Sequence, residues 1–297
     1  MSVELFVQLL VNGLAIGMVY VLVVLGIDMI LRGTKILNFA HGQVYMLGAY
    51  VFYLAYGVLH LGFVVALALS VLALSILGAL CYISVFDSVQ RRFGVGTSFS
   101  YRLLMSAMAS VGLMMILQQG TLLAFGTSEK GVPSVFPQMV AFGDVRFPLE
   151  RLVIILLCLF ICAGLYLFMF RTKLGKAMRA VSYDAEISSL MGINPFLLFL
   201  VCFVVGCALA AFAGGIAASV FSITPIMGQT IIFMAFLVMV VGGIGSYKGA
   251  ILGGILVGLA LSFGYQFLGG ISQVVFFIFV MIVLIFKPGG ILGEVLD

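Results

Sequence analysis

The sequence predicts an all-α polytopic membrane protein with about nine (8–10) transmembrane or re-entrant helices. The 297 residues have a mean hydropathy of +1.35, and only 8% of them are charged, whereas about a quarter of the residues of a soluble domain are charged. Long apolar segments recur along the whole chain, and most reach the roughly 20 residues that a helix needs to cross a bilayer. An outer-membrane barrel would instead show alternating segments of about ten residues.

Nine apolar segments define the expected helices, in one transmembrane domain over residues 1–297. They cover residues 5–31, 39–59, 63–85, 103–125, 152–170, 196–221, 230–245, 249–268 and 271–286. The seventh is short and closes on a glycine-rich stretch, which is typical of a half-helix or a re-entrant segment. A membrane tolerates such a segment only where protein or a cavity covers its backbone.

Basic residues set the expected orientation, because cytoplasmic loops are enriched in Lys and Arg. With loop 171–195 in the cytoplasm, 11 of the 14 basic residues fall on that side. The N-terminus is then expected outside and the C-terminus inside. The extracytoplasmic loop 126–151 carries three of the six prolines, which favours ordered turns over a helix. A contact with an extracytoplasmic partner and a plain lid over the helix ends are both open for this loop.

Residues 171–195 form a long polar island that begins with four basic residues. Ser182 and Asp184 can accept hydrogen bonds from the free N–H groups of a short helix, and Gly192 is a typical C-terminal stop. Ile187, Leu190 and Met191 follow at helical spacing and give this helix a narrow apolar stripe. Two interpretations remain open, a helix lying on anionic lipid and a docking helix for a soluble partner.

A second polar stretch, residues 38–43, stands at the start of the second apolar segment. Asn38 is placed to cap that helix, which would leave His41 and Gln43 in its first turns. These residues are either interfacial polar groups of a capped helix or a polar section of a transport path or gate. Small residues spaced four apart predict close helix packing, within the chain or with a second membrane subunit. The glycines concerned are Gly206 and Gly214, with Ala210 between them, and Gly245, Gly249 and Gly253.

Several kinds of chemistry are not expected. The stretch Gly243–Lys248 lacks the pattern of a phosphate-binding loop, and no spacing of His, Cys and acidic residues predicts a metal site or a nucleophile. The five cysteines fall in apolar segments and are interpreted as packing residues. Asp28 is the one acid deep in a segment, and Arg32 follows one helical turn later. The small number of charges within the membrane argues against a transporter coupled to ions. We therefore expect the energy for transport to come from outside this chain, through a segment that docks a partner.

Four motifs resemble one known family over nearly the whole chain. They are NFAHG (38–42) followed by YMLGAY (45–50), RAV (179–181) leading to LMGIN (190–194), Phe236–Gly245 leading into Gly249–Gly253, and KPGGILG (287–293). On these residues the chain resembles the permease subunits of branched-chain amino acid ABC importers, of the LivH type. The resemblance implies a non-catalytic subunit with the ABC importer permease fold that works by alternating access in a bacterial inner membrane.

The resemblance also implies partners and residue roles. The partners are a second, LivM-like permease, two cytoplasmic ATPases that use ATP and Mg, and a periplasmic substrate-binding protein; no cofactor or metal on this chain and no nucleic acid are expected. The residues implied in ATPase coupling are Arg179, Asp184, Ala185, Glu186, Ile187, Leu190, Met191 and Gly192. Those assigned to the substrate path or gate are Asn38, Phe39, His41, Gly42, Gln43 and Tyr45.

Asp28 and Lys35 depart from the usual pattern of such permeases. Because of this departure, the transported substrate is not settled by the resemblance. Related permeases carry urea, short amides and aromatic acids as well as leucine, isoleucine and valine. A stand-alone channel or an ion-coupled carrier is the alternative from a different class of protein.

Overall fold

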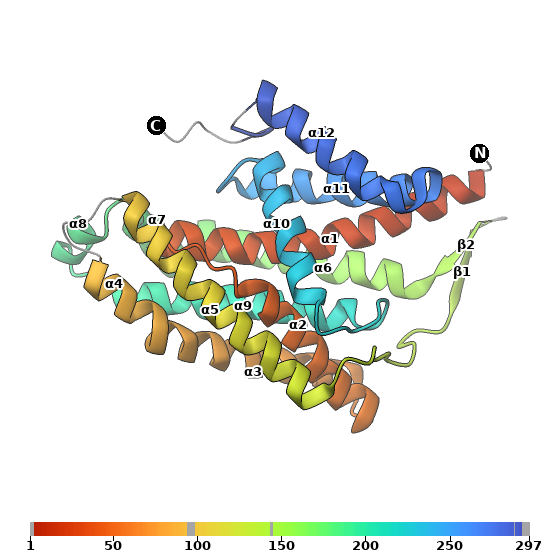
Figure 1. Ribbon diagram of the computed structural model, residues 1–297, viewed down its shortest axis with the longest axis horizontal. Coiled ribbons are helices and arrows are strands. Elements are labelled where there is room, and N and C mark those ends of the chain that lie inside the picture. The colour runs from red at the N-terminus through yellow and green to blue at the C-terminus, as the bar shows by residue number, and fades with distance from the viewer. Residues whose placement is uncertain (1–2, 94–98, 143–144, 288, 293–297) are drawn as a thin grey trace. The chain divides into compact units, whose positions relative to one another are not determined.

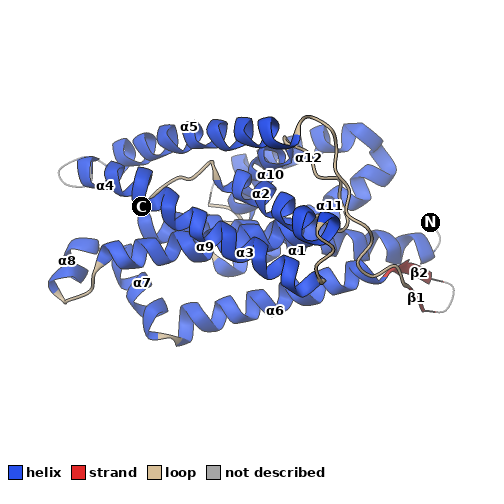
Figure 2. Ribbon diagram, turned by 90° about the horizontal axis from the view of Figure 1, so that it is seen from below, coloured by secondary structure: helices blue, strands red, loops and turns tan. Residues whose placement is uncertain are grey.

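The computed structural model describes residues 3–93, 99–142, 145–287 and 289–292, and helices dominate its secondary structure (Figure 1, Figure 2). In chain order the elements are α1 (Val3–Thr34), α2 (His41–Phe52) with its π-helical end η1 (Tyr53–Val58), α3 (Phe63–Cys81), η2 (Tyr82–Phe86), α4 (Asp87–Phe93), α5 (Phe99–Phe125), β1 (Met139–Phe142), β2 (Val145–Pro148), α6 (Leu149–Arg171), α7 (Lys173–Tyr183), α8 (Ala185–Leu190), α9 (Pro195–Ala217), α10 (Met227–Gly242), α11 (Tyr247–Leu268), η3 (Gly269–Ile271) and α12 (Ser272–Phe286).

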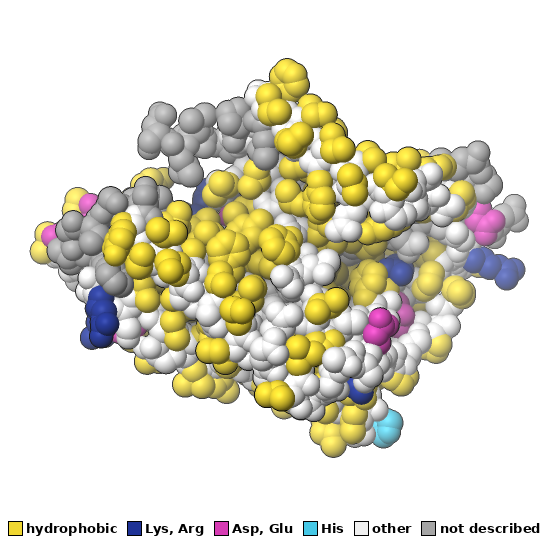
Figure 3. All heavy atoms as spheres, in the orientation of Figure 1, with side chains coloured by type: hydrophobic (Ala, Val, Ile, Leu, Met, Phe, Trp, Pro, Cys, Tyr) yellow, Lys and Arg dark blue, Asp and Glu magenta, His cyan; other side chains and the backbone are white. Residues whose placement is uncertain are grey.

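The predicted fold class is confirmed. Within the described residues, six helical stretches are long and apolar enough to cross a membrane, and α10 is an apolar helix of shorter length. Each of the nine predicted segments lies on a helix. Hydrophobic side chains are spread over the visible face of the molecule with few charged ones between them (Figure 3), as expected for a multi-pass membrane protein.

Two local predictions need correction, whereas the ordered turns expected in loop 126–151 are compatible with the hairpin found there. Helix α2 begins at His41, and no side chain caps it. Asn38 accepts from the N–H of Ala40 (3.0 Å) inside the preceding turn and so is not the cap. The basic start of the polar island is not a loop but helix α7, which Thr172 caps by accepting from the N–H of Gly175 (3.0 Å). The loop 126–151 contains an antiparallel hairpin, β1–β2.

The chain divides into two compact units built from non-contiguous segments. The first unit comprises Met1–Leu25, Pro133–Phe160 and Phe233–Asp297, and the second comprises Gly26–Val132 and Ile161–Ile232. The single domain over 1–297 stays a prediction. Both units use glycine to bring backbones together, which is the usual device of helix packing in lipid.

In the first unit, α1 packs against α11 through glycines. A Cβ on Gly17 would lie 2.7 Å from the carbonyl oxygen of Gly254, and Gly13 lies in the same way against Gly258. The Ser262 hydroxyl of α11 donates to the carbonyl of Leu9 (2.7 Å). In the hairpin region, Glu150 accepts from the N–H of Val135 (2.6 Å), which orders the turn before β1.

In the second unit, α9 is the central helix and packs on α2, on α3 and on the end of α1. Gly206 faces Ile30 and Gly26 of α1, and Gly214 faces the Tyr45 carbonyl of α2. An aromatic cluster forms in this unit, where the ring of Phe203 of α9 lies tilted against the rings of Tyr82 and Phe86, with centroids 5.1 and 4.9 Å away. These contacts hold α2 between α9 and the rest of the unit.

Candidate functional site

The connection between α1 and α2 is anchored on the middle of α5. The Phe39 N–H donates to Ser110 Oγ (3.0 Å), and the same hydroxyl donates to the Leu37 carbonyl (3.1 Å). The Leu37 N–H in turn donates to Ser106 Oγ (3.3 Å). Ser110 lies near the middle of the 27-residue helix α5. Helix α2 therefore starts well inside the length of a neighbouring spanning helix and not at its end.

The polar residues predicted for the path are buried at this place. Asn38 and Tyr45 are each 4% exposed, while His41 and Gln43 are fully buried. Neither side-chain nitrogen nor oxygen of Gln43 has a hydrogen-bond partner within the described chain. A buried polar group without a partner costs about 1–3 kcal/mol, so the sequence retains Gln43 at a cost in stability. The interfacial interpretation does not fit this burial.

The starts of α2 and α10 touch through glycine. Gly42 is the second residue of α2 and Gly228 the second residue of α10. A Cβ on Gly228 would lie 2.6 Å from the Gly42 carbonyl oxygen and 2.7 Å from Gln43 Oε1. Glycine at both positions allows the two backbones to meet. It also leaves room for the Gln43 amide against Gly228. The sequence analysis missed Gly228, although Met227-Gly228-Gln229 repeats His41-Gly42-Gln43 at the start of another short helix.

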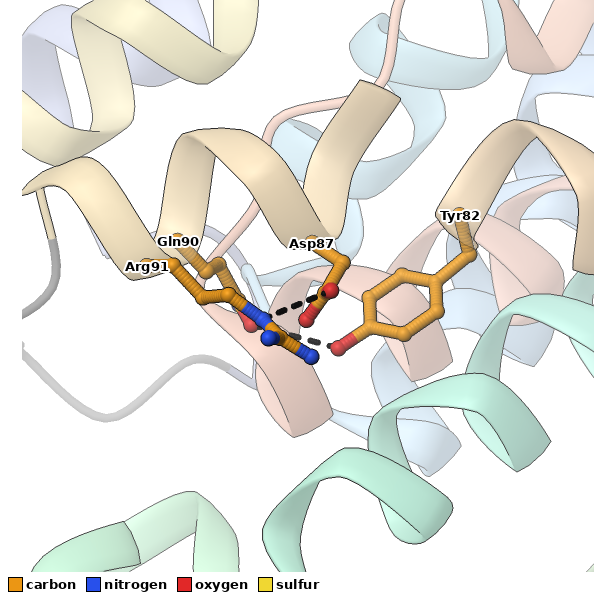
Figure 4. A network of polar contacts seen from close by, with 4 residues as sticks. All are labelled: Tyr82, Asp87, Gln90 and Arg91. Atoms are coloured by element: carbon orange, nitrogen blue, oxygen red, sulfur yellow. Dashed lines mark hydrogen bonds and ion pairs between the residues drawn. The ribbon is translucent and has the colours of Figure 1, made fainter. Parts of the chain in front are cut away.

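A hydrogen-bonded group connects the end of α1 to α4 (Figure 4). Gln90 Nε2 donates to the Thr34 carbonyl (2.8 Å), and the Tyr82 hydroxyl donates to Gln90 Oε1 (3.4 Å). On the same helix Arg91 pairs with Asp87 (2.8 Å). Since Thr34 also accepts from the Ile36 N–H (3.3 Å), the chain leaving α1 is fixed on both sides.

A pocket of about 620 Å³ lies beside this group, at the end of the second unit where α4 and α8 are found (Figure 1). Its lining brings together residues just before the predicted path and residues of the polar island. Basic and acidic side chains both reach it, namely Lys35, Arg102, Asp184 and Glu186. The structure thus places the chain that leaves α1, residues 33–36, next to the polar island.

Lys35 is an unusual residue of this pocket. Its φ of +58° is in the left-handed region, which a residue with a Cβ rarely adopts and which stores strain. Burial lowers the pKa of its ammonium group, and the charges of Arg32 and Arg102 lower it further. Lys35 thus forms a cluster of positive charge with two arginines where α1 ends.

The polar island folds as two helices that meet at Asp184. Asp184 caps α8 by accepting from the N–H groups of Glu186 and Ile187 (both 2.9 Å), as predicted. Gly192 has a φ of +82° and allows the chain to turn into α9, where Pro195 takes the first position. Arg179 of α7 donates to the Met169 carbonyl and lies 5.0 Å from the Phe170 ring.

The apolar stripe of α8 points away from the unit. Ile187 is 60% exposed, Leu190 82% and Met191 79%, and Tyr183 at the end of α7 is 92% exposed. Adjacent exposed apolar side chains on an otherwise polar segment mark an interaction surface. We refer to Tyr183, Ile187, Leu190 and Met191 as the α8 tip.

The predicted packing glycines divide into two groups. Gly206, Gly214, Gly249 and Gly253 each lie against the backbone or side chains of a neighbouring helix. Gly245 lies in the turn between α10 and α11, where its φ of +78° is one that glycine adopts readily. The packing role predicted for it stays a prediction.

The remaining titratable and thiol groups do not assemble into a reactive centre. Among the described residues, there is no group of three or more His, Cys, Asp or Glu side chains that could hold a metal ion. No disulfide joins the five cysteines, which all lie in the part of the chain that the structure describes, and four of them are buried. Asp28 is buried in α1, and Arg32 is exposed. Glycine contacts, a buried polar helix start and an exposed apolar tip belong to a multi-pass membrane protein with an exposed interaction surface.

Comparison with known proteins identifies the family. Residues 9–286 match the family described as "Branched-chain amino acid transport system / permease component", and the chain belongs to it. It is 33% identical to the high-affinity branched-chain amino acid transport system permease protein BraD of Pseudomonas aeruginosa over 296 residues, covering 97% of this chain and 96% of BraD. No solved structure matches the chain.

Two further relatives are similar over a comparable length. LivH of Escherichia coli K12, a high-affinity branched-chain amino acid transport system permease protein, is 30% identical, with 97% of this chain and 96% of LivH covered. A probable branched-chain amino acid transport permease protein LivH of Methanocaldococcus jannaschii is 29% identical, with 92% and 88% covered. The chain is therefore a permease component of a multi-component transport system.

Proposed function

We propose that this chain is the membrane-spanning permease of an ATP-driven ABC importer that carries branched-chain, hydrophobic amino acids by alternating access. ATP and Mg bind to two ATPase subunits and not to this chain. A second related permease completes the membrane part, and an extracytoplasmic binding protein delivers the cargo. In a bacterial cell the chain lies in the inner membrane, with the N-terminus outside and the C-terminus in the cytoplasm.

The α8 tip is the observation that carries this proposal. Helix α8 is capped on one side by Asp184 and ended by Gly192 on the other, so its shape does not depend on a partner. Its apolar stripe is nevertheless exposed, which costs free energy in water unless another surface covers it. A short, rigid helix with an uncovered apolar face suits the groove of a soluble ATPase.

The path from the α8 tip to the membrane part is short. The pocket residues Val181 to Glu186 belong to the α7–α8 segment, and Lys35 and Ile36 lead directly into the start of α2. A movement of α8 would therefore act close to the α1–α2 connection. Ser106 and Ser110 of α5 hold this connection through hydrogen bonds. In the proposed cycle, closure of the ATPase dimer moves α8 as a rigid lever and reorients α2.

Reconstituted transport tests the proposal. The chain is placed in proteoliposomes with the second permease, the two ATPases and the binding protein, and uptake of labelled leucine is measured with and without ATP. We expect uptake that requires ATP and stops when the ATPases carry a substitution in their phosphate-binding lysine. Uptake by this chain alone would instead identify a channel or a carrier. Uptake of urea, short amides or aromatic acids in place of leucine would correct the cargo.

A further inference from the structure

The meeting point of α2 and α10 has features of a ligand site that are independent of the α8 tip. Two short helices begin there with the same pattern, His41-Gly42-Gln43 and Met227-Gly228-Gln229. The start of a helix carries the positive end of its dipole, so two starts in contact produce a region of positive potential. In transporters, interrupted helices whose positive ends meet inside the membrane bind the anionic groups of substrates.

The Gln43 side chain is directed into this region. Its Oε1 lies 2.7 Å and its Cδ 3.0 Å from the position of a Cβ on Gly228, so the amide rests on the first turn of α10. Gln43 is fully buried, and its amide has no hydrogen-bond partner among the described residues. The amide oxygen is the atom that faces Gly228, and the amide nitrogen is a buried hydrogen-bond donor without an acceptor among the described residues.

The backbone N–H groups at this place are largely engaged already. Those of Gln229 and Thr230 donate to the Ile226 carbonyl (3.0 and 3.3 Å), and that of Gln43 donates to the Ala40 carbonyl (3.0 Å). The side-chain amide, rather than these groups, is therefore the donor that a ligand would engage. A ligand that carries a carboxylate supplies the acceptor oxygens and the negative charge that this place lacks.

We propose that the converging starts of α2 and α10, with the Gln43 amide as the donor, bind the carboxylate of the transported amino acid. This proposal rests on the proposed function and adds to it the group of the cargo that the membrane part recognises. A neutral amide binds a carboxylate less tightly than an arginine does. Such a contact orients the cargo and still releases it, as a transport step requires.

The lead-in to α10 connects this site to the opposite end of the second unit. Lys130, just after α5, and Ile223, just before α10, exchange two backbone hydrogen bonds: the Lys130 N–H donates to Ile223 (3.0 Å) and the Ile223 N–H to Lys130 (2.8 Å). Lys130 lies in loop 126–151, so these two backbone hydrogen bonds tie that loop to the residues that lead into α10.

The test compares Gln43→Met with Tyr50→Phe in the full complex. Tyr50 also lies on α2, is 1% exposed and has a hydroxyl without a hydrogen-bond partner in the described chain, but it is not at the α10 start. Because each substitution removes an unpaired buried polar group, each is expected to raise the melting temperature of the complex by about 2–4 °C. Only Gln43→Met is expected to reduce the maximal rate of leucine uptake, by about tenfold, at unchanged half-saturating binding-protein concentration.

Two results would overturn the proposal. Uptake by Gln43→Met within twofold of the natural protein would show that the amide does not handle cargo. A lower melting temperature for Gln43→Met alone would show that the amide has a structural partner. Both are distinct from failure of the proposed function, in which the natural complex itself takes up no leucine with ATP.

A direct binding measurement separates the carboxylate from the rest of the cargo. Thermal unfolding of the permease complex is recorded without binding protein or ATP, in millimolar leucine and in millimolar leucinamide, which lacks the carboxylate. We expect leucine to raise the melting temperature and leucinamide to leave it unchanged, and the leucine effect to vanish in Gln43→Met. An equal rise with both compounds would refute the assignment of the carboxylate.

Discussion

The start of α2 and the α8 tip are opposite kinds of local conflict in the same unit. At the start of α2 a polar amide, Gln43, is fully buried without a partner, whereas at the α8 tip Leu190 and Met191 are apolar and about four-fifths exposed. Each arrangement costs stability in the isolated chain. Both costs disappear when the right partner arrives, an acceptor for the amide and an apolar groove for the tip.

This difference predicts a different kind of partner for each region. Natural sequences usually satisfy burial, polarity and local structure together, and they depart from this agreement at functional sites. A buried polar group selects a small molecule that can enter the protein, while an exposed apolar stripe selects a folded surface. The following predictions test the two regions separately, beginning with the largest effect.

Charges on the α8 tip are expected to have the largest effect. Leu190→Asp with Met191→Asp places two carboxylates on the stripe proposed to dock the ATPase, and the affinity for the ATPase subunits should fall about a hundredfold because two interface anchors are lost. Co-purification of the ATPases and ATP-dependent uptake measure this. The melting temperature of the chain itself should stay the same, because both side chains are exposed.

The matched control keeps the tip apolar. Leu190→Met conserves volume and polarity, so co-purification and uptake should match those of the natural chain. If the double aspartate variant still binds the ATPases, the tip is not the docking surface, and an interfacial helix on anionic lipid becomes the better interpretation of α8.

A side chain at the α2–α10 contact is expected to have the next largest effect. A Cβ on Gly42 would meet the Gly228 carbonyl and Ile232, so Gly42→Ala must separate the two helix starts and should cost about 1–3 kcal/mol. Gly120→Ala in α5 is the control, since a Cβ there meets nothing within 4 Å. It should be neutral or slightly stabilising. Unfolding in denaturant compares the two; equal stabilities would contradict the close contact.

Loss of the α8 cap is expected to have a smaller effect. Asp184→Ala removes the acceptor of two N–H groups and should destabilise α8 by about 1 kcal/mol. Faster amide hydrogen exchange in residues 186–190 checks this. Asp184→Asn retains a capping oxygen and should exchange at the natural rate; fast exchange in both variants would show that the charge, not the cap, supports the helix.

The smallest effect concerns Lys35 and pH. Because burial, with Arg32 and Arg102, lowers its pKa, the folded chain releases this proton at a lower pH than the unfolded chain does. The unfolded chain then binds more protons in the window just below 10.5, the ordinary pKa of lysine, and Lys35 makes stability rise with pH there. Lys35→Met should lack this rise in melting temperature. An identical pH profile in both chains would show that Lys35 titrates normally.

The long helices were predictable from sequence because their apolar length exceeds what any other structure uses. The cap of α8 was predictable as well, since Asp184 and Gly192 act on neighbouring residues. Helix α7 was not predicted because its basic start resembled a loop. The turn Asn38–Ala40 was not predicted because Asn38 was expected to cap α2, whereas it bonds to Ala40 within the turn. These local errors arise where tertiary contacts, such as the hydrogen bonds from α5, decide the conformation.

The burial of Gln43 was beyond sequence reasoning, although Gln43 itself was chosen. Whether an amide near a helix start is buried depends on what packs over it, and here that is Gly228, 185 positions later in the chain. The repeated X-Gly-Gln pattern at 41–43 and 227–229 was the available signal. The turn at Gly245 was also beyond the sequence pattern, since a spacing of four residues does not distinguish a helix from the turn that precedes it.

The pairing of Lys130 with Ile223 uses only main-chain atoms. Side chains at both positions can therefore vary without breaking the backbone connection between loop 126–151 and the residues that lead into α10. Such a loop can change its surface while this connection stays intact. One scaffold can in this way acquire new docking partners by exchanging surface residues alone.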